Sequence, residues 1–417
     1  MPHRSSPGSF GAVLPLMAVV FVAFLVIGLA MPVLPLHVHD ELGLGTFVVG
    51  LVAGSQFASA LLTRPWAGTF SDRRGAKRAV ITGLVAGSAA GLLYLLSLDF
   101  ADPVAAGAIL VSGRLLLGAA ESVIITGAVS WGMVLAGPAN TGRVIAWVGA
   151  AMFAAFAIGA PIGAVLYAAQ GFAAIGIATA LAPLATLLLV VPLRAVPPSG
   201  QERPSFLRVL GAVWQPGAAS ALSSVGFGAI TAFVTLLFAL HGWSHGWLPY
   251  TIFAGVFIIA RLLLGHLPDR IGGANVALVC LLIEAVGLGL IWQSGSPAIA
   301  LLGAALTGLG YSLVYPGFGV EAVRRVPAES RGLAMGAYTA FLDLALGAGG
   351  PLLGLIASGA DLALVFLVSA VAALVGVPIA VRMLIGGPLE NPDSPARHAD
   401  ADRARYRSCR GAAHAGD

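Results

Sequence analysis

The chain carries one signature twice, as RPWAGTFSDRRG at residues 64–75 and as RLLLGHLPDRIG at residues 261–272. Both copies read R-x3-G-x3-D-R, and in both a glycine follows two residues after the second arginine of that pattern. Each copy comes at the end of an apolar segment, which is the second such segment of its half of the chain. A motif that recurs with the same spacing at the same place in each half indicates that the fold repeats one unit.

The composition on either side of these motifs is that of a protein that lies in a lipid bilayer. Hydrophobic residues make up 58% of the 417 positions and charged residues only 10%, which is too few charges for the surface of a water-soluble protein. A helix crosses hydrocarbon of about 30 Å with about 20 apolar residues, and the chain has twelve segments of roughly that length. We expect helices at residues 11–36, 47–70, 79–98, 104–130, 144–169, 173–193, 213–240, 247–267, 274–292, 298–319, 333–358 and 362–384.

Basic residues gather in every second connection between these segments. Connections such as HVHDELGLG (37–45) and HGWSHG (241–246) contain no Lys or Arg. The alternate connections hold Arg73, Arg74, Lys77, Arg78, Arg143, Arg194, Arg203, Arg208, Arg270, Arg324, Arg325 and Arg331. Because loops rich in Lys and Arg stay on the cytoplasmic side of a membrane, the alternation predicts that both chain termini lie in the cytoplasm.

A polar, proline-rich stretch, RAVPPSGQERPSFLR, divides the twelve segments into two sets of six. We therefore expect an N-terminal six-helix domain over residues 1–193, a cytoplasmic linker over 194–212 and a C-terminal six-helix domain over 213–385. The remaining residues, 386–417, are charged and rich in alanine, a composition typical of a disordered cytoplasmic tail.

The repeated signature resembles the cytoplasmic motif of the major facilitator superfamily, G-x3-D-R-x-G-(R/K). The first copy is similar to it at Gly68, Asp72, Arg73 and Gly75, and a Lys–Arg pair follows. The second copy lacks that basic pair but has the corresponding residues Gly265, Asp269, Arg270 and Gly272. The resemblance implies an all-α membrane protein with two six-helix repeats around a central cavity, which opens to either side of the membrane in turn.

Further stretches narrow the resemblance. ILVSGRLLLGAAES (109–122) is similar to the family's second motif, and AIGAPIGAVLY (157–167) to the glycine–proline motif of its drug:proton antiporters. VHDELG, TGRVIAW, SSVGFGAITAFVTL and GYSLVYPGFG resemble the YhhS-type branch, whose members are described as sugar- or arabinose-efflux permeases. The resemblance implies proton-coupled efflux of a small sugar-like or drug-like molecule across the bacterial inner membrane. The protein would be a monomer whose partners are this substrate, protons and the bilayer, with no cofactor, metal or nucleic acid.

In that family the aspartate of the signature holds the cytoplasmic gate closed. The resemblance places Asp72 beside the start of the eleventh helix and Asp269 beside the start of the fifth. A helix N-terminus attracts an anion because its first amides lack partners and its dipole is positive there. The alternative is a loop that only orients and solubilises the chain, but positive-inside sorting requires no Asp or Gly at fixed spacing. The candidate gate residues are Gly68, Asp72, Arg73, Gly75, Gly265, Asp269, Arg270, Gly272, Arg143 and Arg331.

Four ionisable residues are expected within the membrane, namely Arg114, Glu121, Glu284 and Asp343. Each is unfavourable in hydrocarbon, so each is a candidate functional residue. Arg114 and Asp343 are each ten positions into their segments, which is about 15 Å deep and close to the midplane. We expect Glu121 and Asp343 to bind protons beside Arg114, because the resemblance places their helices around the cavity. The alternative is a static arginine–carboxylate pair; for Glu284, on a peripheral helix, a buried structural hydrogen bond is an equal candidate.

Other residues on the inner helices have two interpretations. Glycine–proline elements would kink the fifth and eleventh helices, or they would only allow close packing. These elements contain Gly159, Pro161, Gly350 and Pro351. Polar and amphipathic side chains would line a substrate cavity. Alternatively, the buried tyrosines would only form hydrogen bonds through their own hydroxyl groups. These polar and amphipathic residues are Gln56, Tyr311, Tyr315 and Tyr338.

Two other function classes stay open. Proton-coupled uptake of a sugar or an organic anion fits the same architecture, with a substrate carboxylate on Arg114. A membrane-embedded enzyme or receptor is the alternative of another class, but the sequence has no HExxH, no paired Cys/His ligand spacing and no G-x-S-x-G. A proton-coupled transporter would bring Arg114, Glu121 and Asp343 to one cavity.

Overall fold

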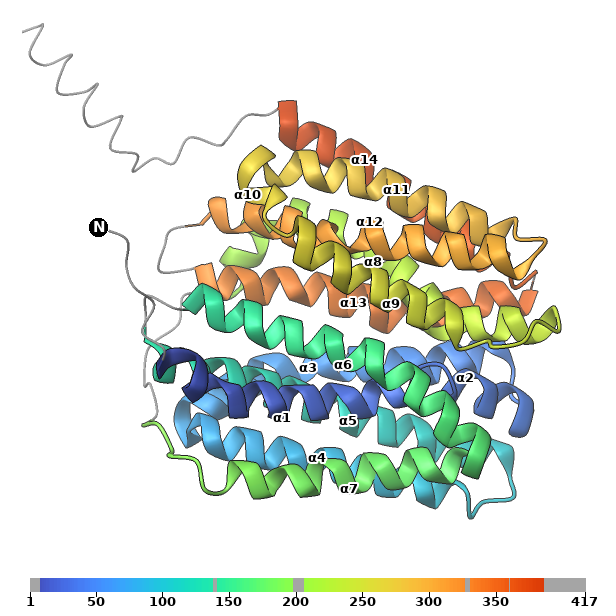
Figure 1. The fold of residues 1–417 in the computed structure, drawn as a ribbon, viewed down its shortest axis with the longest axis horizontal. Helices are drawn as coiled ribbons and strands as arrows, with labels where there is room; N and C mark the ends of the chain where they lie inside the picture. The colour runs from blue at the N-terminus through green and yellow to red at the C-terminus, as the bar shows by residue number, and fades with distance from the viewer. Residues whose placement is uncertain (1–7, 138–140, 198–205, 327–330, 360, 386–417) are drawn as a thin grey trace, which may run out of the picture.

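The computed structural model describes residues 8–137, 141–197, 206–326, 331–359 and 361–385 of the chain. In this part of the chain every regular element is a helix, and the long helices lie side by side along one common direction (Figure 1). Their bounds are α1 Gly8–Ala30, α2 Leu34–Leu36, the π-helical turn η1 His37–Glu41, α3 Thr46–Arg74, α4 Ala76–Ser97, α5 Pro103–Ala136, α6 Thr141–Gln170, α7 Phe172–Val190, α8 Phe206–Leu240, α9 Leu248–Leu264, α10 Leu267–Ile271, α11 Gly273–Trp292, α12 Pro297–Arg324, α13 Arg331–Gly359 and α14 Leu364–Ile385.

These elements contain the twelve membrane helices expected from the sequence. Among the described residues, eleven helical spans are long and apolar enough to cross a membrane, and α9 is a shorter apolar helix of 17 residues. The prediction of an all-helical membrane bundle is therefore confirmed. Several boundaries differ from the expectation by a few residues, and three of them lengthen a helix into an expected connection. The first span continues through α2 and η1 to Glu41, α5 continues to Ala136, and α8 begins at Phe206, inside the expected linker.

The two copies of the repeated signature differ in one local feature. α3 runs without interruption through the first copy to Arg74, whereas α9 ends at Leu264 and α10 begins at Leu267. Pro268, in the first turn of α10, stands where the first copy has Ser71. Because proline cannot donate a backbone hydrogen bond to the preceding turn, it is tolerated at the start of a helix but interrupts a continuous one.

The last glycine of each copy has a clear structural role. Gly75 has φ 91° and ψ 144°, and Gly272 has φ 94° and ψ 137°. Residues that carry a Cβ rarely adopt such angles, because the side chain would clash with the backbone. Each glycine lies directly between two helices, so the motif keeps glycine where the chain leaves one helix and enters the next.

The helices form two halves that lie against each other. The first half, α1–α7, fills the lower part of the view, and the second half, α8–α14, fills the upper part (Figure 1). The halves meet chiefly where α3 packs against α13 and where α6 packs against α9. The second membrane helix of each half thus packs against the fifth membrane helix of the other, as a repeated unit with two-fold pseudosymmetry requires.

The contact between α3 and α13 is made by glycine against glycine. A Cβ built on Gly50 would lie 2.0 Å from the carbonyl oxygen of Gly350, and one on Gly54 would lie 2.7 Å from that of Gly347. Thr46, in the first turn of α3, donates its hydroxyl to the carbonyl of Gly354 over 3.0 Å. Small residues allow two membrane helices to approach to backbone contact, so this part of the interface is tightly closed.

One end of the bundle, which we call the basic end, is where α3, α5, α7, α10 and α12 end. Basic residues lie at the helix ends there, among them Arg73, Arg74, Lys77, Arg78, Arg270 and Arg324. The connections at the opposite end carry none. At the basic end Lys77 donates to the carbonyls of Val191 and Leu193 over 2.6 and 2.7 Å. A cation there satisfies carbonyls at the C-terminus of α7, where the helix dipole is negative. The Gly-to-Gly contact between α3 and α13 lies toward the opposite end.

Candidate functional site

An ion pair joins the two halves in the interior of the bundle. Arg64 of α3 donates through Nη2 to Oδ2 of Asp343 of α13, and the Asp343 side chain is only 5% exposed. Arg64 lies ten residues before the end of α3, about 15 Å from the basic end. Arg64 is not among the four ionisable residues expected within the membrane from the sequence. The partner of Asp343 in the structure is Arg64 and not the expected Arg114.

A second carboxylate lies beside this pair. Gln56 of α3 donates its amide nitrogen to Oε2 of Glu121 of α5 over 2.7 Å. Glu121 interacts electrostatically with Asp343, Arg64 and Arg114. It also lines a small pocket with apolar side chains of α1, α4, α5 and α7. The structure thus brings the two predicted proton-binding residues into one charged cluster, which spans α3, α5 and α13.

Close helix packing sets the position of Gln56 and Glu121. A Cβ on Gly118 would lie 1.9 Å from the carbonyl oxygen of Gln56, so α5 and α3 are in backbone contact there. Glu121 follows Gly118 by three residues and lies on a similar face of α5. A side chain at position 118 would force the helices apart and lengthen the hydrogen bond between Gln56 and Glu121.

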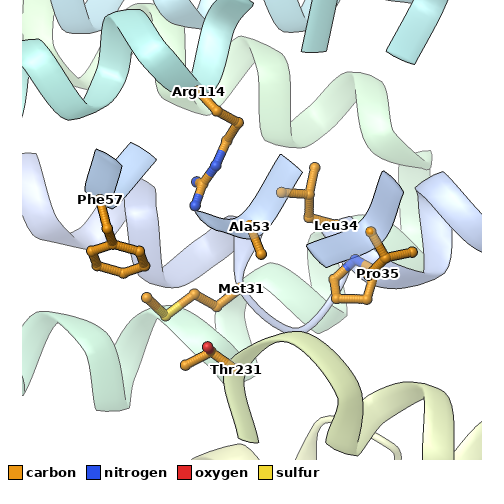
Figure 2. A pocket seen from close by; sticks show the side chains of 8 residues that line it. Met31, Leu34, Pro35, Ala53, Phe57, Arg114 and Thr231 are labelled. Atoms are coloured by element: carbon orange, nitrogen blue, oxygen red, sulfur yellow. The ribbon is translucent and has the colours of Figure 1, made fainter. Parts of the chain in front are cut away.

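Arg114 occupies a different place, on the first-half side of the interface. It is 2% exposed, and it donates to the carbonyl of Val52 over 3.3 Å and to the hydroxyl of Tyr94 over 3.4 Å. Its side chain extends from α5 toward Ala53 into a pocket, as Figure 2 shows. Thr231 of α8 closes that pocket from the other half. The remaining lining residues are Met31, Leu34, Pro35, Val49 and Phe57.

Arg261 is a second arginine within a membrane helix that was not expected there from the sequence. It is the first residue of the second signature and lies in α9, so it corresponds to Arg64 in the repeat. Its guanidinium carbon lies 5.3 Å from the ring centre of Phe153 in α6 and 5.8 Å from that of Phe257. Both arginines fall within the expected apolar segments 47–70 and 247–267, a signal that could have identified them.

Three tyrosines of the second half gather near Arg261, and each interacts electrostatically with it. Tyr315 pairs with the hydroxyl of Thr339 at 2.7 Å, and Tyr338 donates to the backbone carbonyl of Tyr315 over 2.9 Å. Tyr311 lies 3.3 Å from the hydroxyl of Ser224. Every tyrosine hydroxyl in this group has a protein partner, which is the simpler of the two interpretations made from the sequence.

Glu284 lies apart from the interface, within the second half. Ser223 of α8 donates to Oε2 of Glu284 over 2.5 Å, and the Glu284 side chain is fully buried in α11. Its Oε1 atom has no hydrogen-bond partner in the part of the chain that the structure describes. The arrangement is that of the buried structural hydrogen bond considered from the sequence.

The gate residues are only partly described. Gly68 is buried in α3, Asp72 is half-buried near the end of that helix, and Asp269 is exposed in α10. The first turns of α6 and α13 contain Arg143 and Arg331, but the side chains of these arginines lie outside the described residues. The contacts of the two aspartates with these helix starts therefore stay predictions.

The glycine–proline elements lie within continuous helices. α6 continues through Pro161, and α13 continues through Pro351. A Cβ on Gly159 would lie 2.9 Å from the carbonyl carbon of Gly28 in α1, and one on Gly350 would lie 2.4 Å from the carbonyl oxygen of Gly50. This geometry demonstrates close packing for both elements, and a conformational role for the prolines stays a prediction.

A bundle of twelve membrane helices in two repeated halves, with ionisable side chains buried where the halves meet, defines the class of secondary transporters. The chain belongs to the Major Facilitator Superfamily, because the sequence model of that family matches residues 16–274 and 246–410. It is therefore a multi-pass membrane transporter of a small-molecule substrate and not an enzyme.

Individual relatives agree with this assignment. An uncharacterized MFS-type transporter of Salmonella typhimurium is 43% identical over 369 residues, which cover 88% of this chain and 95% of the relative. Another, of Pseudomonas aeruginosa, is 42% identical over 364 residues, which cover 87% and 90%. Among solved structures, a D-xylose–proton symporter has the same fold, with a TM-score of 0.74 at 14% identity over 89% of this chain and 97% of the symporter.

Proposed function

We propose that this transporter exports a small organic molecule across the bacterial inner membrane in exchange for protons, as a monomer with its basic end in the cytoplasm. One observation carries the proposal. The Arg64–Asp343 ion pair connects α3 of one half to α13 of the other, and Glu121 lies within electrostatic reach of it. A titratable bond between the two moving parts of a transporter links protonation to movement.

The free energy of the Arg64–Asp343 pair depends on the conformation of the transporter. Alternating access rocks one half against the other, and a separation of α3 from α13 would leave Arg64 and Asp343 without each other. An ionised side chain without compensation costs on the order of 3 kcal/mol in the membrane interior. Protonation of Asp343 would remove its charge and much of that cost. Proton binding would then favour the conformation in which the pair is open.

Glu121 would complete the proton route. It accepts a hydrogen bond from Gln56 and borders a small pocket, whereas Asp343 is held in the ion pair with Arg64. A carboxylate outside an ion pair takes up a proton more easily than one held in such a pair. Transfer between Glu121 and Asp343 would connect the pocket in the first half to the pair between the halves.

Two features support the direction of transport and the orientation of the chain in the membrane. The basic end follows the positive-inside rule, which supports cytoplasmic termini and an Asp72 and Asp269 gate at that end. The glycine–proline element in α6 is similar to the motif of drug:proton antiporters, which supports efflux. Proton-coupled uptake is the second candidate, because Arg114 lines a pocket between the halves where a sugar or an organic anion could bind.

The experiment separates proton coupling from substrate binding. Inverted membrane vesicles with an acid interior are screened for compounds that dissipate the pH gradient, which identifies a substrate and the direction of exchange. Glu121→Gln and Asp343→Asn are then reconstituted separately in liposomes. We expect the coupling variant to lose accumulation driven by a pH gradient and to retain counterflow, since counterflow needs only reorientation of the loaded carrier. If both variants accumulate substrate as the wild type does, these carboxylates do not couple protons.

A further inference from the structure

Each half contains an equivalent arginine, but the two arginines have different neighbours. Arg64 and Arg261 are the first residues of the two signatures. Asp343, the partner of Arg64, and Phe153, against which Arg261 lies, are 190 residues apart (343 − 153). That separation is also the one between Pro351 and Pro161 and between the first residues of α13 and α6. Phe153 therefore stands where the repeat places Asp343.

The exchange of a carboxylate for a ring leaves the charge of Arg261 without a counter-ion. In the part of the chain that the structure describes, Arg261 has no carboxylate within ion-pair distance, and its buried Nη1 atom has no hydrogen-bond partner. The faces of Phe153 and Phe257 stabilise a cation only partly. A guanidinium with unused donors in a low-dielectric interior favours an anion, above all a carboxylate that accepts two parallel hydrogen bonds.

The surroundings of Arg261 suit an anion with an apolar ring. Phe227 stacks on Tyr311 with ring centres 5.4 Å apart and an interplanar angle of 5°. Phe257 and Phe253 lie 5.8 and 6.1 Å from Tyr311. These rings form a continuous buried aromatic group across α8, α9 and α12, and Phe257 connects it to the guanidinium. The ring of a ligand prefers offset-stacked or edge-to-face contacts with such a group.

We propose that Arg261 binds the carboxylate of the substrate, and that the substrate is an aromatic carboxylate whose ring packs against Phe153, Phe257 and Tyr311. The proposal rests on the proposed transport function and names its substrate class. Tyr315 interacts electrostatically with Arg261, Arg64 and Asp343. The bound anion would thus lie close to the ion pair between the halves, where its charge influences proton binding.

The test measures equilibrium binding to the purified protein in detergent, without any gradient. The probes are aromatic carboxylates, each paired with its neutral amide: benzoate with benzamide, 4-hydroxybenzoate with 4-hydroxybenzamide, and 2-naphthoate with 2-naphthamide. Thermal unfolding and calorimetry report binding. We expect at least one carboxylate to raise the unfolding temperature and its amide to bind at least tenfold more weakly.

Three variants assign the binding to Arg261. Arg261→Gln should weaken carboxylate binding at least tenfold, and Arg261→Lys should retain part of it. Phe153→Asp should also abolish it, because an internal carboxylate would pair with Arg261 as Asp343 pairs with Arg64. Phe153→Asn is the matched control, similar in shape but uncharged, and should bind better than Phe153→Asp. Circular dichroism and gel filtration verify that each variant is folded.

The proposal is overturned if no carboxylate binds, if the amides bind equally well, or if Arg261→Gln binds like the wild type. Measurable carboxylate binding of equal strength in the Phe153→Asp and Phe153→Asn variants would overturn it as well. These results leave proton coupling untouched, since Asp343→Asn and Glu121→Gln address that step in a gradient. Conversely, if both of those variants still accumulate substrate in a pH gradient, the coupling proposal is removed and anion binding at Arg261 stays in place.

Discussion

The contact of α3 with α13 and the contact of α6 with α9 are equivalent in the repeat but differ in chemistry. The first contains an ion pair and backbone-to-backbone glycine contacts. The second contains aromatic side chains, with the rings of Phe153 and Phe257 4.2 Å apart, and an arginine that has no counter-ion among the described residues. The duplicated scaffold thus has one close interface that contains an ion pair and one looser interface that contains aromatic side chains.

The glycines of the two fifth helices explain part of the difference. In α13, Gly347, Gly350 and Gly354 face α3 across the interface between the halves. In α6, Gly159 and Gly163 face α1 within the same half. Because α6 turns its small residues inward, bulky rings separate it from α9. Side chains at such a contact can change rotamer, whereas the backbone contact of α3 with α13 leaves no such freedom.

The largest effect is expected from the loss of the ion pair. Asp343→Asn should destabilise the protein by about 3 kcal/mol, because Arg64 would keep its charge in the interior without a partner. The double variant Arg64→Gln/Asp343→Asn should lose less stability than the sum of the two single variants. Thermal unfolding in detergent measures the stability of the single and double variants. A wild-type unfolding temperature for Asp343→Asn would show that the ion pair does not stabilise the protein.

A smaller effect is expected from the glycine contact. Gly50→Ala should destabilise the protein by roughly 1–3 kcal/mol, because the new methyl group would overlap the carbonyl of Gly350 and push α3 from α13. Gly349→Ala is the control, since a Cβ there meets no atom within 4 Å. The same unfolding measurement should separate the two variants, and equal stability would show that the close contact is dispensable.

The two copies of the gate motif should differ in their effect on transport. Asp72→Asn should reduce turnover while expression stays nearly normal, because the charge stabilises one conformation rather than the fold. Asp269→Asn should reduce it less, since its copy lacks the Lys–Arg pair and is interrupted by Pro268. Turnover of the purified variants in liposomes is the measurement, and wild-type turnover by Asp72→Asn would rule out the gate.

The smallest effect on stability is expected at Arg261. Arg261→Leu should lower the free energy of unfolding by less than about 1 kcal/mol, or should raise it. The loss of two cation–π contacts is offset by the removal of an unpaired charge. Arg64→Leu should instead destabilise the protein, because it leaves Asp343 unpaired. A comparison of their unfolding temperatures sharpens the contrast, and equal losses would mean that Arg261 has a hidden counter-ion.

The helix count and the repeat could be predicted from the sequence. Each membrane helix must satisfy its own backbone hydrogen bonds and present about 20 apolar residues to lipid. Every span can therefore be recognised from a local stretch of sequence. The glycines that end the two signatures are equally local, because only a residue without a Cβ readily adopts the φ of Gly75 and Gly272.

The pairing of side chains could not be predicted in this way. Arg64 and Asp343 are 279 residues apart in the chain, and no periodicity connects them. The sequence placed Arg114 and Asp343 near mid-membrane depth and therefore suggested Arg114 as the neighbour of Asp343, but only the packing of α3 on α13 decides that Asp343 meets Arg64. The same holds for Arg261, which has the residue type of Arg64 and a different neighbour.

The sequence by itself determined which segments enter the membrane, since transfer from water to lipid depends on composition along about 20 residues. It also determined that the unit is repeated, since the signature keeps its spacing. Only the tertiary structure decided that one interface pairs its arginine with Asp343 and the other surrounds it with Phe153 and Phe257. The physical reason is that ion pairing and cation–π contact act over a few ångströms, and helix packing alone determines which side chains come that close.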